Sequence, residues 1–204
     1  LFDSKFDKKI RVIPLAYDKT RLENNYSDSN INNVLMKYHI RQPYIMYIGR
    51  LEEKKNILGL IDAFKTLREK YSFNGQLVLI GKPGYRFEVA KQKIEEYRLE
   101  ELIIQPGWVT EEERIILLKS SAVFVFPSFY EGFGIPPLEA MALGVPVVAS
   151  NAASIPEVVG NAAALFDPSD YYEIAKSLNR VLNNESALRD ILIERGYERI
   201  KKFS

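Results

Sequence analysis

Short apolar runs alternate with amphipathic segments along most of the chain. Between the runs, segments such as 57–67 and 87–99 place their apolar residues on one helical face. This alternation predicts an α/β fold: a Rossmann-like parallel sheet of about six strands with helices on both faces. The predicted strands, each bounded by Gly, Pro, Asn or similar turn residues, are 44–48, 76–80, 102–105, 122–126, 145–149 and 163–166.

Residues 1–40 follow a different pattern. The stretch 23–33 is rich in Asn, Ser and Asp, which favour turns over regular elements. We therefore expect residues 1–40 to be a connecting segment and residues 41–204 to be the folded domain.

Polar residues mark two predicted helix starts. Asn56 is expected to be the N-cap of the helix after the first strand. Ser154 and Glu157 fit a capping box, in which each side chain accepts a backbone hydrogen bond at the start of a helix. Both groups are thus expected to serve local structure.

Composition narrows the class of protein. The chain has 204 residues, is 47% hydrophobic, and carries 28 basic against 27 acidic residues, so its formal net charge is +1. A near-neutral chain argues against nucleic acid as a partner. The sequence contains no apolar run of the roughly 18 residues that a membrane-spanning helix needs. Its lack of cysteine excludes disulfides, thiol nucleophiles and Cys–zinc sites and is compatible with the cytoplasm.

Two carboxylates flank a glycine-containing turn after the fourth predicted strand. The sequence Glu131-Gly-Phe-Gly-Ile-Pro-Pro-Leu-Glu139 leads from that strand into a short helix. Gly132 and Gly134 let main-chain N–H groups approach a ligand closely, as in an anion site. Glu139 is expected in the first helical turn, where the helix dipole favours a carboxylate. A simpler interpretation is that Glu139 only stabilises the helix start and Glu131 is a solvated loop charge.

Further candidate groups follow other strands at the same edge of the predicted sheet, which is where open α/β sheets bind ligands. Arg50 and Lys55 follow the first strand, and their side chains suit phosphate: Arg as a fork, Lys as a point charge. A solvated helix entrance is the alternative. Gly107, Trp108 and Val109 follow the third strand, where Trp108 either walls a pocket or packs.

These segments resemble the group 1 (family 4) retaining glycosyltransferases, whose two Rossmann-like domains form the fold called GT-B. The resemblance rests on Tyr47-Ile-Gly-Arg-Leu51 with Lys55-Asn56, on Gly107-Trp-Val109, and on the 131–139 motif continuing to Ser150. It covers about residues 10–200. It implies that residues 41–204 are the C-terminal, nucleotide-sugar-binding domain.

The resemblance also implies a role for each candidate residue. Arg50 and Lys55 would hold the donor diphosphate, so that neither a metal nor another cofactor is needed. The backbone from Gly107 to Val109 would recognise the base, and Glu139 would accept hydrogen bonds from the ribose. Glu131 would be the catalytic residue, facing the transferred sugar and an oxocarbenium-like transition state. It would act with the backbone of Gly132, Phe133, Gly134 and Ile135.

The predicted function is transfer of a hexose, with retention, from a nucleotide diphosphate sugar to a saccharide or lipid-linked acceptor. The motif is similar to that of mannosyltransferases of bacterial polysaccharide assembly, which favours GDP-mannose over a UDP-sugar as donor. Two alternatives are a non-catalytic GT-B-like interaction module and another GT-B enzyme, such as a phosphorylase or an epimerase. A phosphorylase requires a pyridoxal-phosphate lysine, for which no motif is evident.

The family's N-terminal, acceptor-binding domain is not in these 204 residues, and the chain starts at Leu1 without Met. We therefore expect a fragment that binds nucleotide but is not a complete catalyst. Family members of this kind work in the cytoplasm, often at the inner face of the cell membrane. Any peripheral membrane association is expected to depend on the missing domain.

Overall fold

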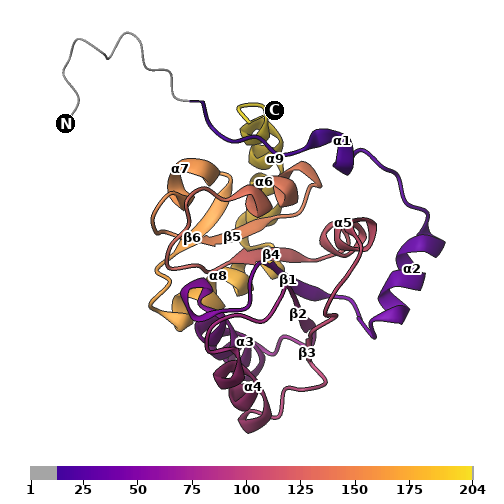
Figure 1. Cartoon of the computed structure of the whole chain (residues 1–204). Coiled ribbons are helices and arrows are strands. Elements are labelled where there is room, and N and C mark those ends of the chain that lie inside the picture. Colours follow the sequence, from indigo (N-terminus) through magenta and orange to yellow (C-terminus); the bar gives the residue numbers. More distant parts are fainter. Residues whose placement is uncertain (1–12, 204) are drawn as a thin grey trace.

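The computed structural model describes residues 13–203 and contains a six-stranded parallel sheet. The strand order is β3-β2-β1-β4-β5-β6, so the direction of winding reverses between β1 and β4 (Figure 1). This confirms the predicted α/β class, although the third strand is shorter than expected. The strands are β1 (Tyr44–Ile48), β2 (Gln76–Ile80), β3 (Ile103–Ile104), β4 (Val123–Phe126), β5 (Val147–Ser150) and β6 (Ala163–Phe166).

Helices cover both faces of the sheet because successive strand residues point to opposite sides. Ile45 and Tyr47 of β1 pack with α3, α4 and α8, whereas Tyr44 and Met46 pack with α2, α5, α6 and α7 (Figure 1). The helices are α1 (Lys19–Leu22), α2 (Asp28–Lys37), α3 (Ile57–Tyr71), α4 (Phe87–Glu96), α5 (Glu111–Lys119), α6 (Ile135–Ala142), α7 (Ile155–Val159), α8 (Tyr171–Leu182) and α9 (Leu188–Ile200), with 3₁₀ turns η2 (Glu53–Lys55) and η3 (Glu185–Ala187).

The loops after β1 and β2 run in close contact at the carboxyl edge of the sheet. Gly81 adopts φ 157°, and a Cβ there would lie 1.8 Å from the carbonyl oxygen of Gly49. The Leu51 amide donates to the Lys82 carbonyl at 2.9 Å, and the Gly84 amide donates to the Leu51 carbonyl at 2.8 Å. Glycine is thus required where the two backbones approach, and the loops form one connected surface.

The turn prediction for residues 23–33 is wrong from Asp28 onward, where α2 begins. The Ser27 hydroxyl caps α2 by accepting a hydrogen bond from the Asn30 amide at 3.2 Å. Leu35 of α2 is buried in the core on the α5 side. Tertiary burial therefore overrides the local turn preference of Asn and Ser. The expectation of a strictly connecting role for residues 1–40 stays a prediction, because residues 1–12 lie outside the described part.

Glu113 of α5 fastens α2 to the domain. Its carboxylate accepts from Lys37 Nζ at 2.6 Å, from the Tyr38 hydroxyl at 2.9 Å and from the Thr110 amide at 2.9 Å. The Thr110 hydroxyl in turn accepts from the Glu113 amide at 3.2 Å, which completes a capping box. One carboxylate thereby joins a helix start to a neighbouring helix end.

We predict an acid-sensitive contribution from Glu113. Burial raises its pKa, but hydrogen bonds from Lys37, Thr110 and Tyr38 outweigh burial and lower the pKa from 4.5 to about 2. A folded-state pKa below the unfolded value means that the stabilisation is present above about pH 4.5 and is lost as the pH falls toward about 2. Urea unfolding across this range should show a shallower loss of stability for Glu113→Gln than for the wild type. The exposed neighbour Glu112→Gln is the control, and parallel curves for Glu113→Gln and the wild type would contradict the prediction.

Candidate functional site

The candidate site lies at the carboxyl ends of β1 and β4, where the strand order reverses. The helices after these two strands lie on opposite faces, so the loops that lead to them diverge, which is the arrangement that forms the ligand crevice of open α/β sheets. We call this edge the β1–β4 crevice. The β1 loop carries Arg50 and Lys55, and the β4 loop carries Glu131 and the glycines that precede α6. The structure therefore brings together residues that are about 80 positions apart along the chain.

Glu131 is held on both of its carboxylate oxygens. Lys55 Nζ lies 2.7 Å from Oε2, and the side chains of Lys55 and Glu131 are 16% and 14% exposed. The Ser128 hydroxyl donates to Oε1 at 2.7 Å. The carbonyl of Ser128 accepts from the buried Ser150 hydroxyl at 2.7 Å, which links the turn to β5. The interpretation of Glu131 as a solvated loop charge does not fit this geometry.

Glu139 is held by a residue that the sequence analysis missed. Arg114 of α5 forms a fork, with Nη1 2.8 Å from Oε2 of Glu139 and Nη2 3.0 Å from Oε1. Arg114 also pairs with Glu111 at 2.9 and 2.7 Å. Burial lowers the pKa of the guanidinium, but the hydrogen bonds that it donates to Glu111 and Glu139 outweigh burial and raise the pKa. Arg114 therefore stays charged between two carboxylates.

The expected position of Glu139 in the first helical turn is wrong. Helix α6 starts at Ile135, four residues before Glu139, and its first turn contains no acidic residue. The two prolines fit inside the first turn, so the helix begins earlier than the apolar pattern indicated. The charge of Glu139 is offset by Arg114 and not by the helix dipole.

Arg50 is the more open of the two candidate phosphate-binding cations. Its Nε lies 3.3 Å from Glu52 Oε2, and its side chain is exposed. Its carbonyl accepts from the Tyr47 hydroxyl at 3.0 Å. Burial raises the pKa of Tyr47, and the negative charges of Glu131 and Glu52 raise it further. The phenol thus stays protonated and fixes the start of the β1 loop.

Two glycine positions leave main-chain groups accessible around the crevice. A Cβ on Gly132 would meet nothing within 4 Å, and Gly107 sits at φ 75° with similar free space. Gly134, at φ 141°, precedes the first residue of α6.

The apolar candidate residues differ in burial. Ile135 and Val109 are half-buried. Trp108 is exposed, so the interpretation that Trp108 packs inside the protein is wrong. The Phe133 ring packs edge-on against Phe203 at 5.8 Å.

Both predicted capping residues serve tertiary structure instead. Asn56 makes no side-chain cap and donates from Nδ2 to the Pro168 carbonyl at 2.7 Å. Ser154 makes no cap either. Its hydroxyl lies 2.8 Å from the carbonyl of Glu131 and 2.9 Å from that of Phe133, and shares its hydrogen with both. Ser154 therefore fixes the backbone of the glycine turn, a role that sequence spacing does not reveal.

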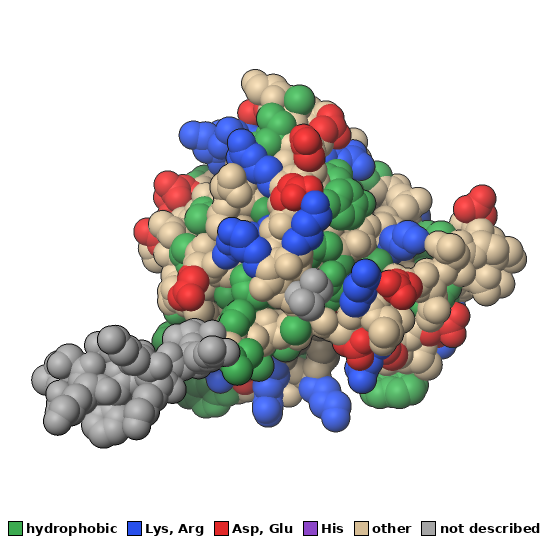
Figure 2. Space-filling view, turned by 90° about the horizontal axis from the view of Figure 1, so that it is seen from above, with side chains coloured by type: hydrophobic (Ala, Val, Ile, Leu, Met, Phe, Trp, Pro, Cys, Tyr) green, Lys and Arg blue, Asp and Glu red, His purple; other side chains and the backbone are tan. Residues whose placement is uncertain are grey.

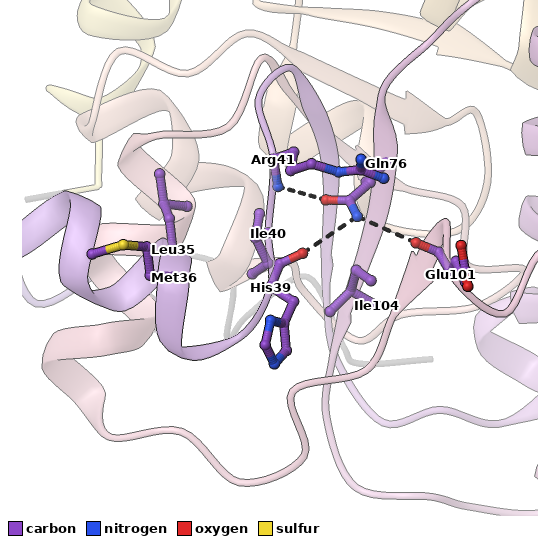
Figure 3. Close-up of a pocket in the computed structure, with 8 residues that line it drawn as sticks. All are labelled: Leu35, Met36, His39, Ile40, Arg41, Gln76, Glu101 and Ile104. Atoms are coloured by element: carbon purple, nitrogen blue, oxygen red, sulfur yellow. Dashed lines mark hydrogen bonds between the residues drawn. The ribbon is translucent and has the colours of Figure 1, made fainter.

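A separate cavity of about 640 Å³ lies at the amino-terminal ends of the strands (Figure 3). Its buried polar group is Gln76, whose Oε1 accepts from the Arg41 amide at 2.6 Å. The Gln76 Nε2 donates to the carbonyls of His39 and Glu101 at 3.4 and 3.3 Å. The Gln76 amide therefore joins β2 to segment 39–41 and to Glu101, and His39 is exposed. This cavity offers no chemistry comparable to that of the β1–β4 crevice.

Charged side chains of both signs mix on the face seen from above in Figure 2. Basic residues are spread over this face, with acidic residues between them. On the described part of this face, no continuous basic surface of the kind that binds nucleic acid is visible. None of the helices among residues 13–203 is long and apolar enough to cross a membrane.

A family model decides the class of the protein. The model for glycosyl transferases group 1 matches residues 37–199. The chain belongs to the group 1 glycosyltransferases. This confirms the predicted family, and the β1–β4 crevice with its Glu131–Glu139 motif lies wholly within the matched range.

Related group 1 glycosyltransferases and similar structures support this assignment. O-antigen chain mannosyltransferase B of Escherichia coli is 42% identical over 172 residues, covering 84% of this chain and 45% of that protein. The C-terminal domain of a group 1 family protein from Francisella tularensis has a TM-score of 0.75 at 26% identity, covering 90% of this chain and 96% of that one. HepE from Anabaena, solved with UDP, has a TM-score of 0.78 at 21% identity, covering 93% and 52%. The chain spans less than half the length of its first curated relatives.

We predict that Arg114 and Glu139 are energetically coupled. Removing Arg114 leaves the largely buried carboxylate of Glu139 unpaired, whereas Glu111 is exposed and retains its hydration. A double-mutant cycle of Arg114→Ala with Glu139→Gln, followed by urea unfolding, should give a coupling of about 1–3 kcal/mol. The matched cycle of Arg114→Ala with Glu111→Gln should give a coupling below about 1 kcal/mol. Equal couplings in the two cycles would contradict the prediction, because Arg114 would then be coupled no more strongly to Glu139 than to Glu111.

Proposed function

We propose that this chain is the donor-binding domain of a glycosyltransferase that moves a hexose, with retention, from a nucleotide diphosphate sugar to a saccharide or lipid-linked acceptor. The observation that carries the proposal is the Lys55–Glu131 ion pair at the β1–β4 switch point. It sets a cation and a carboxylate side by side at the edge where α/β sheets bind nucleotides.

In this proposal the diphosphate lies between the β1 loop and the start of α6. Arg50 and Lys55 supply positive charge to the leaving nucleotide, so that fixed cations, without a metal ion, stabilise the charge that develops there. The backbone of Gly132, Phe133, Gly134 and Ile135 adds N–H groups at a helix start, where anions are favoured. The open space around Gly132 supports a close approach by the ligand.

Glu131 faces the transferred sugar in this arrangement. A carboxylate fixed by Lys55 and Ser128 is preorganised, so it needs little rearrangement when positive charge develops on the sugar ring. When the phosphate oxygens pair with Lys55, less of the negative charge of Glu131 is offset. The carboxylate can then stabilise the oxocarbenium-like centre. Lys55 thus connects departure of the nucleotide to stabilisation of the sugar.

The nucleoside extends from the same crevice toward α5. Glu139 accepts hydrogen bonds from the ribose hydroxyls while Arg114 holds its carboxylate in place. The backbone from Gly107 to Val109 contacts the base. The name of the Escherichia coli relative supports mannose as the sugar, and hence GDP-mannose as donor, with a UDP-sugar as the alternative.

The acceptor domain, in this proposal, belongs to a part of the protein beyond these residues. The chain spans less than half of its first relatives, and family members close two Rossmann-like domains around their substrates. We therefore propose binding without efficient transfer for the isolated chain. The whole enzyme would act in the cytoplasm, at the inner face of the membrane where lipid-linked acceptors are presented.

We predict that the chain binds a nucleotide sugar with millimolar to high-micromolar affinity. Two charge-assisted contacts contribute about 1.5–3 kcal/mol each, and roughly 4 kcal/mol corresponds to millimolar binding. Saturation-transfer NMR with GDP-, UDP- and ADP-sugars should therefore detect binding of at least one. Arg50→Ala and Lys55→Ala should each weaken it about tenfold or more, because 1.4 kcal/mol is a factor of ten.

The control is Lys91→Ala, which removes an exposed cation on α4 that pairs with Glu88, away from the proposed site. It should leave nucleotide binding unchanged. Absence of saturation transfer to every donor at millimolar concentration would remove the proposal. Binding that survives both Arg50→Ala and Lys55→Ala would place the nucleotide elsewhere and favour a non-catalytic module.

A further inference from the structure

A second cavity opens at the same edge of the sheet, on the β1–β2 side of the donor crevice. It has a volume of about 620 Å³ and is bounded by loops that follow β1, β2 and β4. We call it the aromatic pocket, and its lining residues are Glu52, Glu53, Lys54, Tyr85 and Phe129. None of these residues has a part in the proposed donor site.

The aromatic side chains of this pocket are unusually open to solvent. Tyr85 is 73% exposed and Phe129 is 44% exposed, and the adjacent Tyr130 is exposed as well. Large aromatic rings generally bury most of their surface, so a group of exposed rings around a hollow marks a binding surface. Each ring face carries a partial negative charge that attracts slightly positive C–H groups.

Backbone hydrogen bonds hold the two loops that carry the lining rings. The Glu53 amide donates to the Tyr85 carbonyl at 3.2 Å, and the Phe129 amide donates to the Lys54 carbonyl at 3.1 Å. Arg86, next to Tyr85, pairs with Glu53 at 2.6 Å. Both aromatic loops are thereby attached to the same short segment, so the pocket is formed before any ligand arrives.

The carboxylates of the pocket are suited to accept hydrogen bonds from hydroxyls. Glu52 is mostly buried, with one oxygen 3.3 Å from Arg50 and the other 3.3 Å from Lys54. An ionised carboxylate has about four acceptor positions, so Glu52 still accepts from a ligand while its own geometry is fixed. Glu53 is likewise paired with Arg86, so both lining carboxylates are fixed as acceptors that ligand hydroxyls can reach.

We propose that the aromatic pocket binds a neutral pyranoside, namely a sugar unit of the acceptor saccharide. The C–H face of a pyranose ring stacks on Tyr85 and Phe129, and its hydroxyls donate to Glu52 and Glu53. Lys54 precedes Lys55, and Phe129 lies two residues before Glu131, so the pocket adjoins the sugar end of the donor crevice. The assignment to the acceptor rests on the proposed glycosyltransferase function, whereas the saccharide chemistry rests on the pocket itself.

The test is a titration of the 204-residue protein with methyl α-D-mannopyranoside and with an α-linked mannobiose, followed by NMR shifts of the aromatic rings. Both saccharides should shift the Tyr85 and Phe129 signals. Tyr85→Ala and Phe129→Ala should each weaken binding at least tenfold, whereas Tyr85→Phe, which keeps the ring face, should retain it. Tyr172→Ala is the matched control, because it removes an exposed tyrosine on α8.

A parallel nucleotide-sugar titration separates this proposal from the donor site. Tyr85→Ala should leave nucleotide affinity within about twofold, whereas Lys55→Ala should lower it. The aromatic pocket is overturned if nucleotide binds but neither saccharide shifts the two rings, or if Tyr85→Ala binds saccharide as the wild type does. It is also overturned if nucleotide displaces the saccharide from Tyr85, since the cavity would then belong to the donor. Saccharide binding that depends on Tyr85 without any nucleotide binding would support the pocket and defeat the proposed function.

Discussion

The ion pair between Lys55 and Glu131 is the interaction on which the site depends. Both side chains are largely buried, and an unpaired charge is unfavourable in a buried position. Each side chain therefore offsets the free-energy cost of burying the other. Their contact exists because β1 and β4 are parallel neighbours, with Ile45 opposite Val123, although the two loops are far apart along the chain. Sheet topology and the charge pair therefore define the crevice together.

The two carboxylates of the motif are paired with cations of different character. Glu131 has Lys55, a point charge on a flexible stem that can turn toward a phosphate. Glu139 has Arg114, a planar fork that also binds Glu111 and is therefore fixed from two sides. This difference suits the proposed roles. Glu131, near the reacting sugar, has a partner that can also bind phosphate, whereas Glu139, near the ribose, has a partner that stays in place.

Sequence patterns were sufficient for the sheet and for the segments that carry the site, because apolar runs and glycine turns encode buried strands and their ends locally. They were insufficient wherever a polar side chain has a distant partner. Arg114 looked like one charge on an amphipathic helix, and Ser154 looked like a helix cap, yet both act on the β4 loop. Helix α2 was missed because its Asn-rich sequence favours turns, while burial of Leu35 and the contacts to Glu113 favour a helix.

The edge of the sheet is divided by the segment 52–55 into regions of different chemistry. On its β4 side, Lys55 joins the charged crevice proposed for the donor, whereas on its β2 side Lys54 lines the aromatic pocket. Transfer of a sugar requires an anionic nucleotide to leave and a neutral hydroxyl to attack, so two substrates of different charge must meet within bonding distance. A charged crevice and an aromatic stacking surface that share one short, hydrogen-bonded loop would meet this requirement. In the proposed arrangement, this shared backbone and the contact between Arg50 and Glu52 would keep the two substrates in register.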